Sequence, residues 1–190
     1  MTLLVLTAPS GAGKTTIARR LMAEVPGLQF SVSATTRAPR PTERDGVDYV
    51  FLSEEVFRQR VADGDFLEYE EVYPGRLYGT QRQAVEETAR SAGVRAVVLD
   101  IDVKGAVNVK HLYGDDALTL FIAPPSLDAL ADRLHGRGTE TEAQIRTRLE
   151  RAEMEMTYAA GFDVVVVNDD LETAMSETIA AVTDFLDARA

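Results

Sequence analysis

An apolar run, a glycine-rich turn and an amphipathic helix follow one another at the N-terminus of this chain. Thr2–Thr7 has the pattern of a buried strand, and apolar residues recur at helical spacing from Lys14 to about Glu24. The turn between them ends in Gly13-Lys14-Thr15. Glycines let consecutive backbone N–H groups curl toward a phosphate, and the N-terminus of the following helix favours negative charge. This order of elements predicts a phosphate-binding turn at the edge of a parallel sheet.

The turn has the spacing of a P-loop, which binds a nucleoside triphosphate. We expect Lys14 to reach the β- and γ-phosphates of ATP and the Thr15 hydroxyl to bind Mg²⁺. Such motifs usually open with glycine, and this chain has Ala8 at that position. The residues predicted to contact ATP here are Ala8, Pro9, Ser10, Gly11, Ala12, Gly13, Lys14, Thr15 and Thr16.

Strand and helix patterns alternate along the rest of the chain, which favours a parallel sheet with helices on both faces. Helices are predicted over about 54–62 with Ser53 as N-cap, and over about 81–91, 126–134, 142–160 and 171–186. Strands are predicted over 49–52, 66–73, 96–101, 118–123 and 164–167. The stretch 31–48 is rich in loop-forming residues. The prediction is one α/β domain with the three-layer P-loop NTPase fold.

The charge balance limits the partners of this chain. With 31 acidic against 20 basic residues, the net charge of −11 argues against a general nucleic-acid binder. The absence of cysteine excludes disulfides and thiolate metal sites. No apolar run approaches membrane-spanning length, and the short apolar N-terminus indicates a strand rather than a signal peptide. We expect a cytoplasmic protein with no nucleic-acid or membrane partner, and a homo-oligomer is left open.

Two acidic residues follow the apolar run that begins at Ala96. Asp100 lies near the end of this strand, and Asp102 comes two residues later. Ligands of a parallel sheet bind outside the carboxyl ends of its strands, so an acid here suits Mg²⁺ or its waters. The alternative is an aspartate that caps a helix. The separate roles of Asp100 and Asp102 stay open at this point.

Arginine side chains predict where a second phosphate binds. Arg37 and Arg40 flank a proline in the loop-rich stretch, and planar guanidinium groups suit bidentate binding of phosphate oxygens. Hydroxyls such as those of Tyr49 and Tyr78 would complete this site. By contrast, Arg44, Arg133, Arg146 and Arg151 are expected to be solvated residues with ordinary ion pairs.

The second phosphate would belong to a nucleotide that accepts a phosphoryl group from ATP. A carboxylate with a nearby hydroxyl suits guanine as the base of this acceptor. One carboxylate can accept from both guanine N1 and the exocyclic amine, and a hydroxyl can donate to O6. Adenine would leave the carboxylate unpaired. Glu68 and Thr80 fit these tasks, but Glu70 and Glu71 lie close to Glu68 in the chain, so composition alone does not assign the carboxylate.

Short motifs in a characteristic order resemble those of the guanylate kinase family along nearly the whole chain. They lie at 8–15, 30–40, 45–49, 66–68, 78–80, 99–102, 121–125, 137–140 and 167–170. The resemblance implies a P-loop core at about 1–32, 94–135 and 153–190. It also implies a GMP-binding (nucleoside-monophosphate-binding) insert at about 33–93 and a lid at about 136–152. Lys104 stands where the family usually has glutamine.

The resemblance also implies an activity and the roles of particular residues. The activity is in-line transfer of the γ-phosphoryl group from MgATP to GMP, giving ADP and GDP in purine nucleotide metabolism. The GMP phosphate would be held by Ser33, Arg37, Arg40, Tyr49 and Tyr78. Guanine would be read by Glu68, Thr80 and Asp102. Arg137 in the lid and Arg148 would approach the transferred phosphoryl group, and Asn168 would lie near the adenine of ATP. Together with the residues predicted from the P-loop and the strand end, the catalytic candidates are Lys14, Arg137 and Arg148, and the metal candidates are Thr15 and Asp100.

Three other functions compete with this interpretation. A non-catalytic interaction module of the same fold is disfavoured because Gly13-Lys14-Thr15 and the lid arginines are retained. A related kinase for AMP or a ribose phosphate is disfavoured by Glu68 and Thr80. A P-loop motor or switch ATPase would need coupling elements for which 190 residues leave no room.

Overall fold

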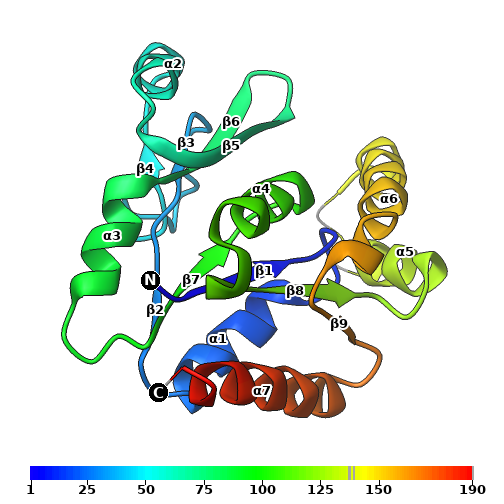
Figure 1. Cartoon of the computed structure of the whole chain (residues 1–190). Coiled ribbons are helices and arrows are strands. Elements are labelled where there is room, and N and C mark those ends of the chain that lie inside the picture. Colours follow the sequence, from blue (N-terminus) through cyan, green and yellow to red (C-terminus); the bar gives the residue numbers. More distant parts are fainter. Residues whose placement is uncertain (137, 139, 190) are drawn as a thin grey trace. The chain divides into compact units, whose positions relative to one another are not determined.

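The computed structural model describes residues 1–136, 138 and 140–189, and of Tyr73 the backbone only (Figure 1). The chain divides into two compact units. Unit 1 consists of residues 1–4 and 27–117, and unit 2 consists of residues 5–26 and 118–190. Each unit is described by itself.

The strands form two sheets. The main sheet has the order β2-β7-β1-β8-β9, and the smaller sheet has the order β4-β3-β6-β5. Strand β1, which ends the first stretch of unit 1 and begins unit 2, contributes to both units. The main sheet contains β1 (Leu3–Thr7), β2 (Leu28–Phe30), β7 (Ala96–Asp100), β8 (Ala117–Ala123) and β9 (Val164–Val167). The smaller sheet contains β3 (Ala34–Thr35), β4 (Val50–Phe51), β5 (Phe66–Tyr73) and β6 (Arg76–Gln81).

Helices alternate with these strands as the sequence predicted. They are α1 (Lys14–Glu24), α2 (Glu54–Ala62), α3 (Arg82–Arg90), α4 (Val103–Tyr113), α5 (Leu127–Gly136), α6 (Glu142–Met156) and α7 (Leu171–Asp187), with short 3-10 turns at Gly114–Asp116 and Ala159–Gly161. Strands β2 and β7 pair in parallel in unit 1, and β8 and β9 pair in parallel in unit 2. The predicted α/β fold with a mostly parallel sheet is therefore confirmed.

The smaller sheet of unit 1 has its own core. Strands β5 and β6 form an antiparallel hairpin, and α2 contributes Phe57 to the face of the sheet. The rings of Phe57 and Phe66 stack with their centroids 4.4 Å apart, in a cluster that also contains the buried side chains of Ala34 and Leu77. Aromatic stacking of this kind stabilises a small core beyond the area it buries. This core supports the strands that carry the predicted GMP-binding residues.

Two pairs of helices organise unit 2. Helix α1 packs against α7, and α5 packs against α6. The second pair buries Leu130 and Leu134 of α5 against Ile145 and Ala152 of α6, with Leu149 beside them. Ile145, Leu149 and Ala152 recur at helical spacing, so they form the apolar face by which α6 packs on α5. None of the described helices is long and apolar enough to cross a membrane.

Several elements differ from the prediction. The helix predicted over 142–160 ends at Met156, because a separate 3-10 turn follows at Ala159–Gly161. Helix α4 was missed because glycine and β-branched valines give it weak helical propensity. Strands β2, β3 and β6 were also missed. Strand β3 is only two residues long and pairs with β4 and β6, so partners from other parts of the chain define it.

Candidate active site

In unit 2, the glycine-rich turn leads directly into α1. The N–H of Ala12 donates to the carbonyl of Pro9 at 3.0 Å, which closes the turn. Gly13 has a φ of 101°, a conformation that residues with a Cβ rarely adopt, and it forms the N-cap of α1 without a side-chain hydrogen bond. The first turn of α1 also has no acidic residue. The helix N-terminus is thus suited to an anion from outside the chain.

Asn168, which follows β9, braces the turn. Its side chain is buried, and its amide Nδ2 donates to the carbonyl of Ala12 at 2.7 Å. A Cβ on Gly13 would collide with this amide. Arg133 of α5 donates to the backbone carbonyl of Asn168 at 2.8 Å, so the expectation that Arg133 is merely solvated is wrong. The predicted contact of Asn168 with adenine stays a prediction.

Helix α6 brings a guanidinium group to the same turn. Nη1 of Arg148 donates to the Ser10 hydroxyl, and Nη2 lies 2.7 Å from Oε1 of Glu140. Thr141 and Gln144 form a capping box that begins α6 at a defined residue. The structure therefore joins Arg148 to the phosphate-binding turn, as a role near the transferred phosphoryl group requires.

The other residues predicted on the ATP side are placed by α1. Lys14 is its first residue and is half-buried, while Thr15 and Thr16 are exposed in its first turn. Arg137, predicted to act from the lid, lies outside the described residues.

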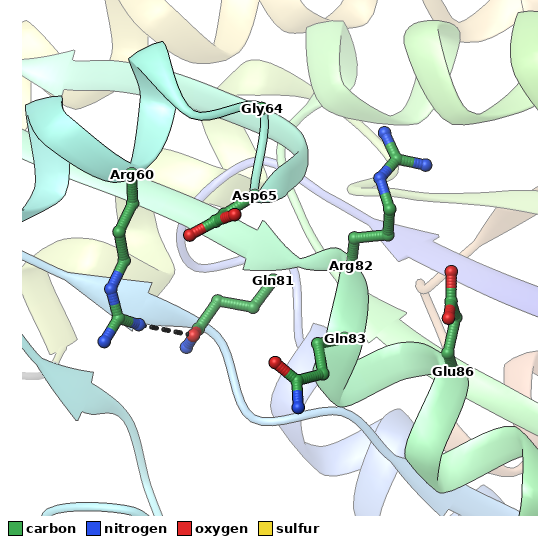
Figure 2. Close-up of a pocket in the computed structure, with 7 residues that line it drawn as sticks. All are labelled: Arg60, Gly64, Asp65, Gln81, Arg82, Gln83 and Glu86. Carbon is green, nitrogen blue, oxygen red and sulfur yellow. Dashed lines mark hydrogen bonds between the residues drawn. The ribbon is translucent and has the colours of Figure 1, made fainter.

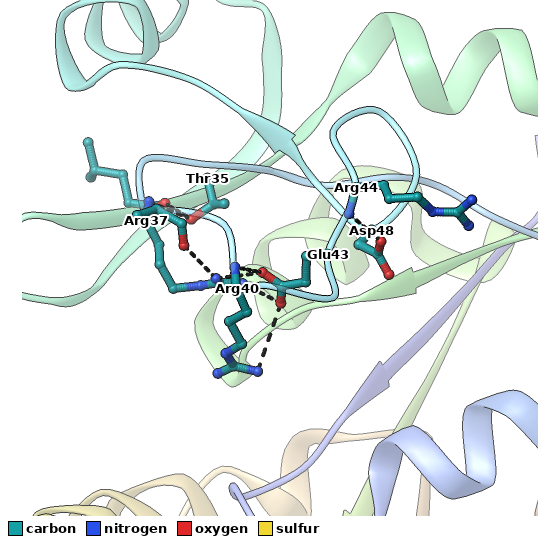
Figure 3. Close-up of polar contacts among 8 residues, drawn as sticks. Thr35, Arg37, Arg40, Glu43, Arg44 and Asp48 are labelled. Carbon is teal, nitrogen blue, oxygen red and sulfur yellow. Dashed lines mark hydrogen bonds and ion pairs between the residues drawn. The ribbon is translucent and has the colours of Figure 1, made fainter.

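In unit 1, aromatic rings and a carboxylate enclose Arg37. Its guanidinium carbon lies 5.3 Å from the ring centroid of Tyr49 and 5.7 Å from that of Phe51. The rings of Tyr49 and Tyr78 are themselves 6.0 Å apart. Figure 3 shows that Arg37 also forms a two-pronged ion pair with Glu43, at 2.7 and 2.9 Å. The structure thus brings together the predicted phosphate ligands Arg37, Tyr49 and Tyr78.

The remaining predicted phosphate ligands lie on the same loop or beside it. Arg40 has a largely exposed side chain, and its backbone N–H donates to the Glu43 carboxylate. Ser33 immediately precedes β3, and its carbonyl accepts from the N–H of Val50 at 2.9 Å. Sequence reasoning missed Glu43, although its place three residues after Arg40 was a signal that it could cap the loop.

Charge and burial shift the pKa values of this cluster. Hydrogen bonds to Glu43 raise the pKa of Arg37, although partial burial opposes the shift, and Tyr78 adds a smaller contribution in the same direction. Burial raises the pKa of the Tyr49 phenol, and the charge of Asp100 raises it further. At neutral pH the cluster therefore presents a guanidinium beside the neutral hydroxyl of Tyr49, which suits a phosphate dianion.

A buried carboxylate lies on β5, the edge strand of the smaller sheet. Glu68 on β5 faces Thr80 on β6, and the Thr80 hydroxyl donates to Glu68 Oε1 at 2.5 Å. Glu68 is only 7% exposed. Burial raises its pKa to about 7, against the opposing Thr80 hydrogen bond and with help from the charge of Asp102. The predicted guanine ligands Glu68, Thr80 and Asp102 are therefore neighbours.

The first turn of α4 lies against this carboxylate. Asp102 is the N-cap of α4, and its Oδ1 accepts from the N–H of Gly105 at 2.8 Å. A Cβ on Gly105 would lie 2.6 Å from Glu68 Oε2, so glycine is needed for the close approach of helix and carboxylate. The sequence left open whether Asp100 or Asp102 caps a helix rather than binding a ligand. Asp102 is the residue that caps a helix. Asp100 is half-buried at the end of β7.

The neighbouring acids have other partners. Glu70 lies 2.7 Å from the ammonium of Lys104, and Glu71 accepts from the N–H of Gly75 at 2.7 Å. Glu70 is half-buried and Glu71 is exposed. Burial therefore separates Glu68 from the two residues that composition could not exclude.

Within the described part of the chain, no cluster of three or more His, Cys, Asp or Glu residues could enclose a metal ion. Mg²⁺ usually binds one or two protein groups together with waters and substrate phosphates. The exposed hydroxyl of Thr15 and the carboxylate of Asp100 are oxygen donors of the type that this ion prefers. They fit the predicted metal.

A pocket lies in unit 1, at the junction of β6 and α3 (Figure 2). Arg60 donates to the side chain of Gln81 across it at 2.7 Å. Its lining consists of Arg60, Gly64, Asp65, Gln81, Arg82, Gln83 and Glu86. It contains none of the predicted site residues, and we assign it no role.

Comparisons with known proteins agree with this arrangement. The family model described as guanylate kinase matches residues 1–188. A guanylate kinase from Salinibacter ruber is 60% identical over 184 residues, which cover 97% of this chain and 96% of that protein. One from Bacteroides fragilis is 49% identical over 183 residues, with coverages of 96% and 89%.

A solved structure extends this agreement to the fold. The crystal structure of guanylate kinase from Anaplasma phagocytophilum is 31% identical and matches with a TM-score of 0.73, covering 99% of this chain and 85% of that one. The fold is therefore that of a P-loop NTPase. By sequence and by structure, the chain belongs to the guanylate kinase family and is a kinase.

Proposed function

We propose that this protein transfers the γ-phosphoryl group of ATP to GMP, giving ADP and GDP, through the residues described above. Family membership supports the reaction. The observation that carries the choice of acceptor is the buried carboxylate of Glu68, held by Thr80 against the first turn of α4. A buried carboxylate needs hydrogen-bond donors, and guanine supplies two on one edge.

Guanine recognition follows from this pocket. Glu68 in its ionised form accepts from guanine N1 and the exocyclic amine, and Asp102 lies near enough to influence its pKa. The Thr80 hydroxyl already donates to Glu68, so it must turn if it is to donate to guanine O6. Adenine has no matching pair of donors, so binding AMP would leave the carboxylate buried and unpaired.

The acceptor's phosphate binds to the guanidinium and hydroxyl groups of the smaller sheet. Arg37 and Arg40 supply positive charge, and Tyr49 and Tyr78 supply hydroxyls, with Ser33 at the edge of this group. The proximity of the Arg37, Tyr49 and Tyr78 side chains supports this assignment. The phosphate has a second pKa of about 6, so its attacking oxygen is ionised at neutral pH without a general base.

The donor binds at the turn before α1. Residues 8–16, all of which except Pro9 carry a backbone N–H, hold the triphosphate together with the ammonium of Lys14, and Arg148 neutralises charge that develops on the transferred group. Arg137 is proposed for the same task. Thr15 and Asp100 would hold Mg²⁺, which when bound neutralises phosphate charge. The contact of Arg148 with Ser10 supports its assignment.

Exclusion of water is the remaining requirement of this reaction, because water would otherwise accept the phosphoryl group. We assign it to closure of the GMP-binding insert, at about 33–93, and of the lid, at about 136–152. Such closure commonly accompanies phosphoryl transfer.

The direct test is ADP formation from MgATP with GMP, AMP, UMP or CMP supplied separately. GMP should support turnover at least about 100-fold more efficiently than AMP, since a site built to pair with donors rejects an analogue that lacks them. A preference for another acceptor would overturn the proposal. Lys14→Ala should lose most turnover while remaining folded by circular dichroism, whereas a near-normal rate would mean that the phosphate site is misplaced.

A further inference from the structure

The loop that carries Arg37 and Arg40 is organised around one carboxylate, that of Glu43. Glu43 Oε2 accepts from Arg37 Nη1 at 2.7 Å and from the backbone N–H of Arg40 at 2.8 Å. Glu43 Oε1 accepts from Arg37 Nη2 at 2.9 Å and lies 3.8 Å from Arg40 Nη1 (Figure 3). A single side chain thus contacts both of the arginines assigned to the acceptor's phosphate.

Glu43 and Ala38 occupy only part of the Arg37 guanidinium, which also has a weaker hydrogen bond with Tyr78, another predicted phosphate ligand. An arginine has five N–H donors in a planar fork. Nη1 donates to Glu43 and to the carbonyl of Ala38, at 2.7 and 2.8 Å, and Nη2 makes one donation to Glu43. The donors not used in these bonds are Nε–H and the second N–H of Nη2, which together form the side edge of the fork. This edge can bind two phosphate oxygens in parallel.

Glu43 is held in place by more than its charge. Its side chain and that of Arg37 are each only 12% exposed. The N–H of Glu43 donates to the carbonyl of Arg40 at 3.0 Å, so a backbone turn holds the residue on the loop. Hydrogen bonds from Arg37 and then from the Arg40 backbone lower the pKa of Glu43 to about 2, so it is ionised throughout the neutral range. An incoming phosphate would have to break several bonds to displace this carboxylate.

We propose that Glu43 is a positioning residue for the acceptor's phosphate: it fixes the guanidinium of Arg37 so that the Nε/Nη2 edge is presented to the phosphate beside Tyr78, and it fixes the loop backbone at Arg40. This inference rests on the proposed function, since it concerns the phosphate of the same acceptor. A fixed guanidinium loses less conformational freedom on binding, and the opposite carboxylate prevents its plane from rotating.

The test compares Glu43→Gln with a matched control, Asp48→Asn. Asp48 lies on the same loop, and its carboxylate accepts from the backbone N–H of Arg44 at 2.8 Å. An amide can keep such a single backbone bond, but it cannot accept from both Nη atoms of an arginine. Binding of GMP and of guanosine, which lacks the phosphate, is measured by calorimetry. The KM values for GMP and ATP and the kcat are measured alongside.

Glu43→Gln should weaken GMP binding about tenfold or more, because hydrogen bonds to charged groups each contribute on that scale. Guanosine binding and the KM for ATP should stay within about twofold of the wild-type values. Asp48→Asn should leave all of these quantities near wild type. Unchanged or tighter GMP binding in Glu43→Gln, or equal weakening of guanosine, would overturn the proposal, since each contradicts a role in holding the phosphate.

A double-mutant cycle tests whether Glu43 acts through Arg37. Lysine at position 37 can pair with Glu43 but has no side edge, so Arg37→Lys should itself weaken GMP binding. In that background, Glu43→Gln should cost less than about twofold more, whereas an additive loss would refute action through Arg37. If Glu43→Gln does not fold, Glu43→Asp replaces it, because aspartate keeps the charge but is one methylene too short to reach the Arg37 guanidinium from the same backbone position. A wild-type protein that does not phosphorylate GMP would instead refute the proposed function.

Discussion

Protons should be released when guanine binds, because the carboxylate assigned to guanine is buried. The pKa of Glu68 is raised to about 7 chiefly by burial, and only its ionised form can accept from both guanine donors. At pH 7 about half of the empty pockets are protonated, so binding should release about half a proton per GMP. The KM for GMP should rise as pH falls, reaching about tenfold above its high-pH value at pH 6.

The assay is calorimetric titration of the protein at pH 7 in buffers that differ in ionisation enthalpy. The dependence of the observed heat on that enthalpy gives the number of protons released. The GMP phosphate, with a pKa of about 6, contributes only about 0.1 proton at this pH. Guanosine has no phosphate, so it isolates the contribution of the pocket and should still release about half a proton.

Glu68→Gln is the control, since an amide does not titrate. Its proton release with GMP should fall to the small contribution of the phosphate. If wild-type protein releases no proton on binding guanosine, or if the variant releases as many as wild type, the reasoning about burial is refuted. Affinity for ATP should be unaffected by the substitution.

The same pKa shift has a consequence for stability. The folded-state pKa of Glu68 lies above its ordinary value of 4.5, so the unfolded chain gives up this proton at lower pH than the folded chain. The contribution of Glu68 therefore becomes less favourable to folding as pH rises from about 4.5 to 7, by at most about 3 kcal/mol. Chemical denaturation at pH 5 and pH 8 should show a smaller decrease in unfolding free energy for Glu68→Gln than for wild type.

Three further substitutions test individual contacts. Gly105→Ala should raise the KM for GMP about tenfold with little change for ATP, because the added Cβ would lie 2.6 Å from a Glu68 oxygen; an unchanged KM would contradict the close approach. In Asn168→Ala the buried carbonyl of Ala12 loses its hydrogen-bond donor. Chemical denaturation should therefore show an unfolding free energy lower by about 1–3 kcal/mol, and steady-state kinetics should show a higher KM for ATP. Arg148→Lys should lower kcat about tenfold or more at saturating substrates, and an unaffected kcat would exclude the proposed role of its guanidinium.

Local features of the sequence determined much of the fold. The phosphate-binding turn was predicted because its strand, glycines and helix are contiguous, and backbone conformation there depends on neighbouring residues. Helix α2 begins after Ser53, whose side chain accepts from the N–H of Val56 as the N-cap prediction required. The central strands were found because long apolar runs are buried on both faces of a parallel sheet.

Only the tertiary structure decided which polar residues share a pocket. Composition could not choose among Glu68, Glu70 and Glu71, but Glu68 alone of these three is buried, because its strand partner and α4 cover it. The contact of Asn168 with Ala12 joins residues 156 positions apart. Glu43 was present in the sequence as one of many acids, and its two-pronged contact with Arg37 identifies it as part of the site. Burial and long-range pairing depend on how the chain folds back on itself, which no local pattern encodes.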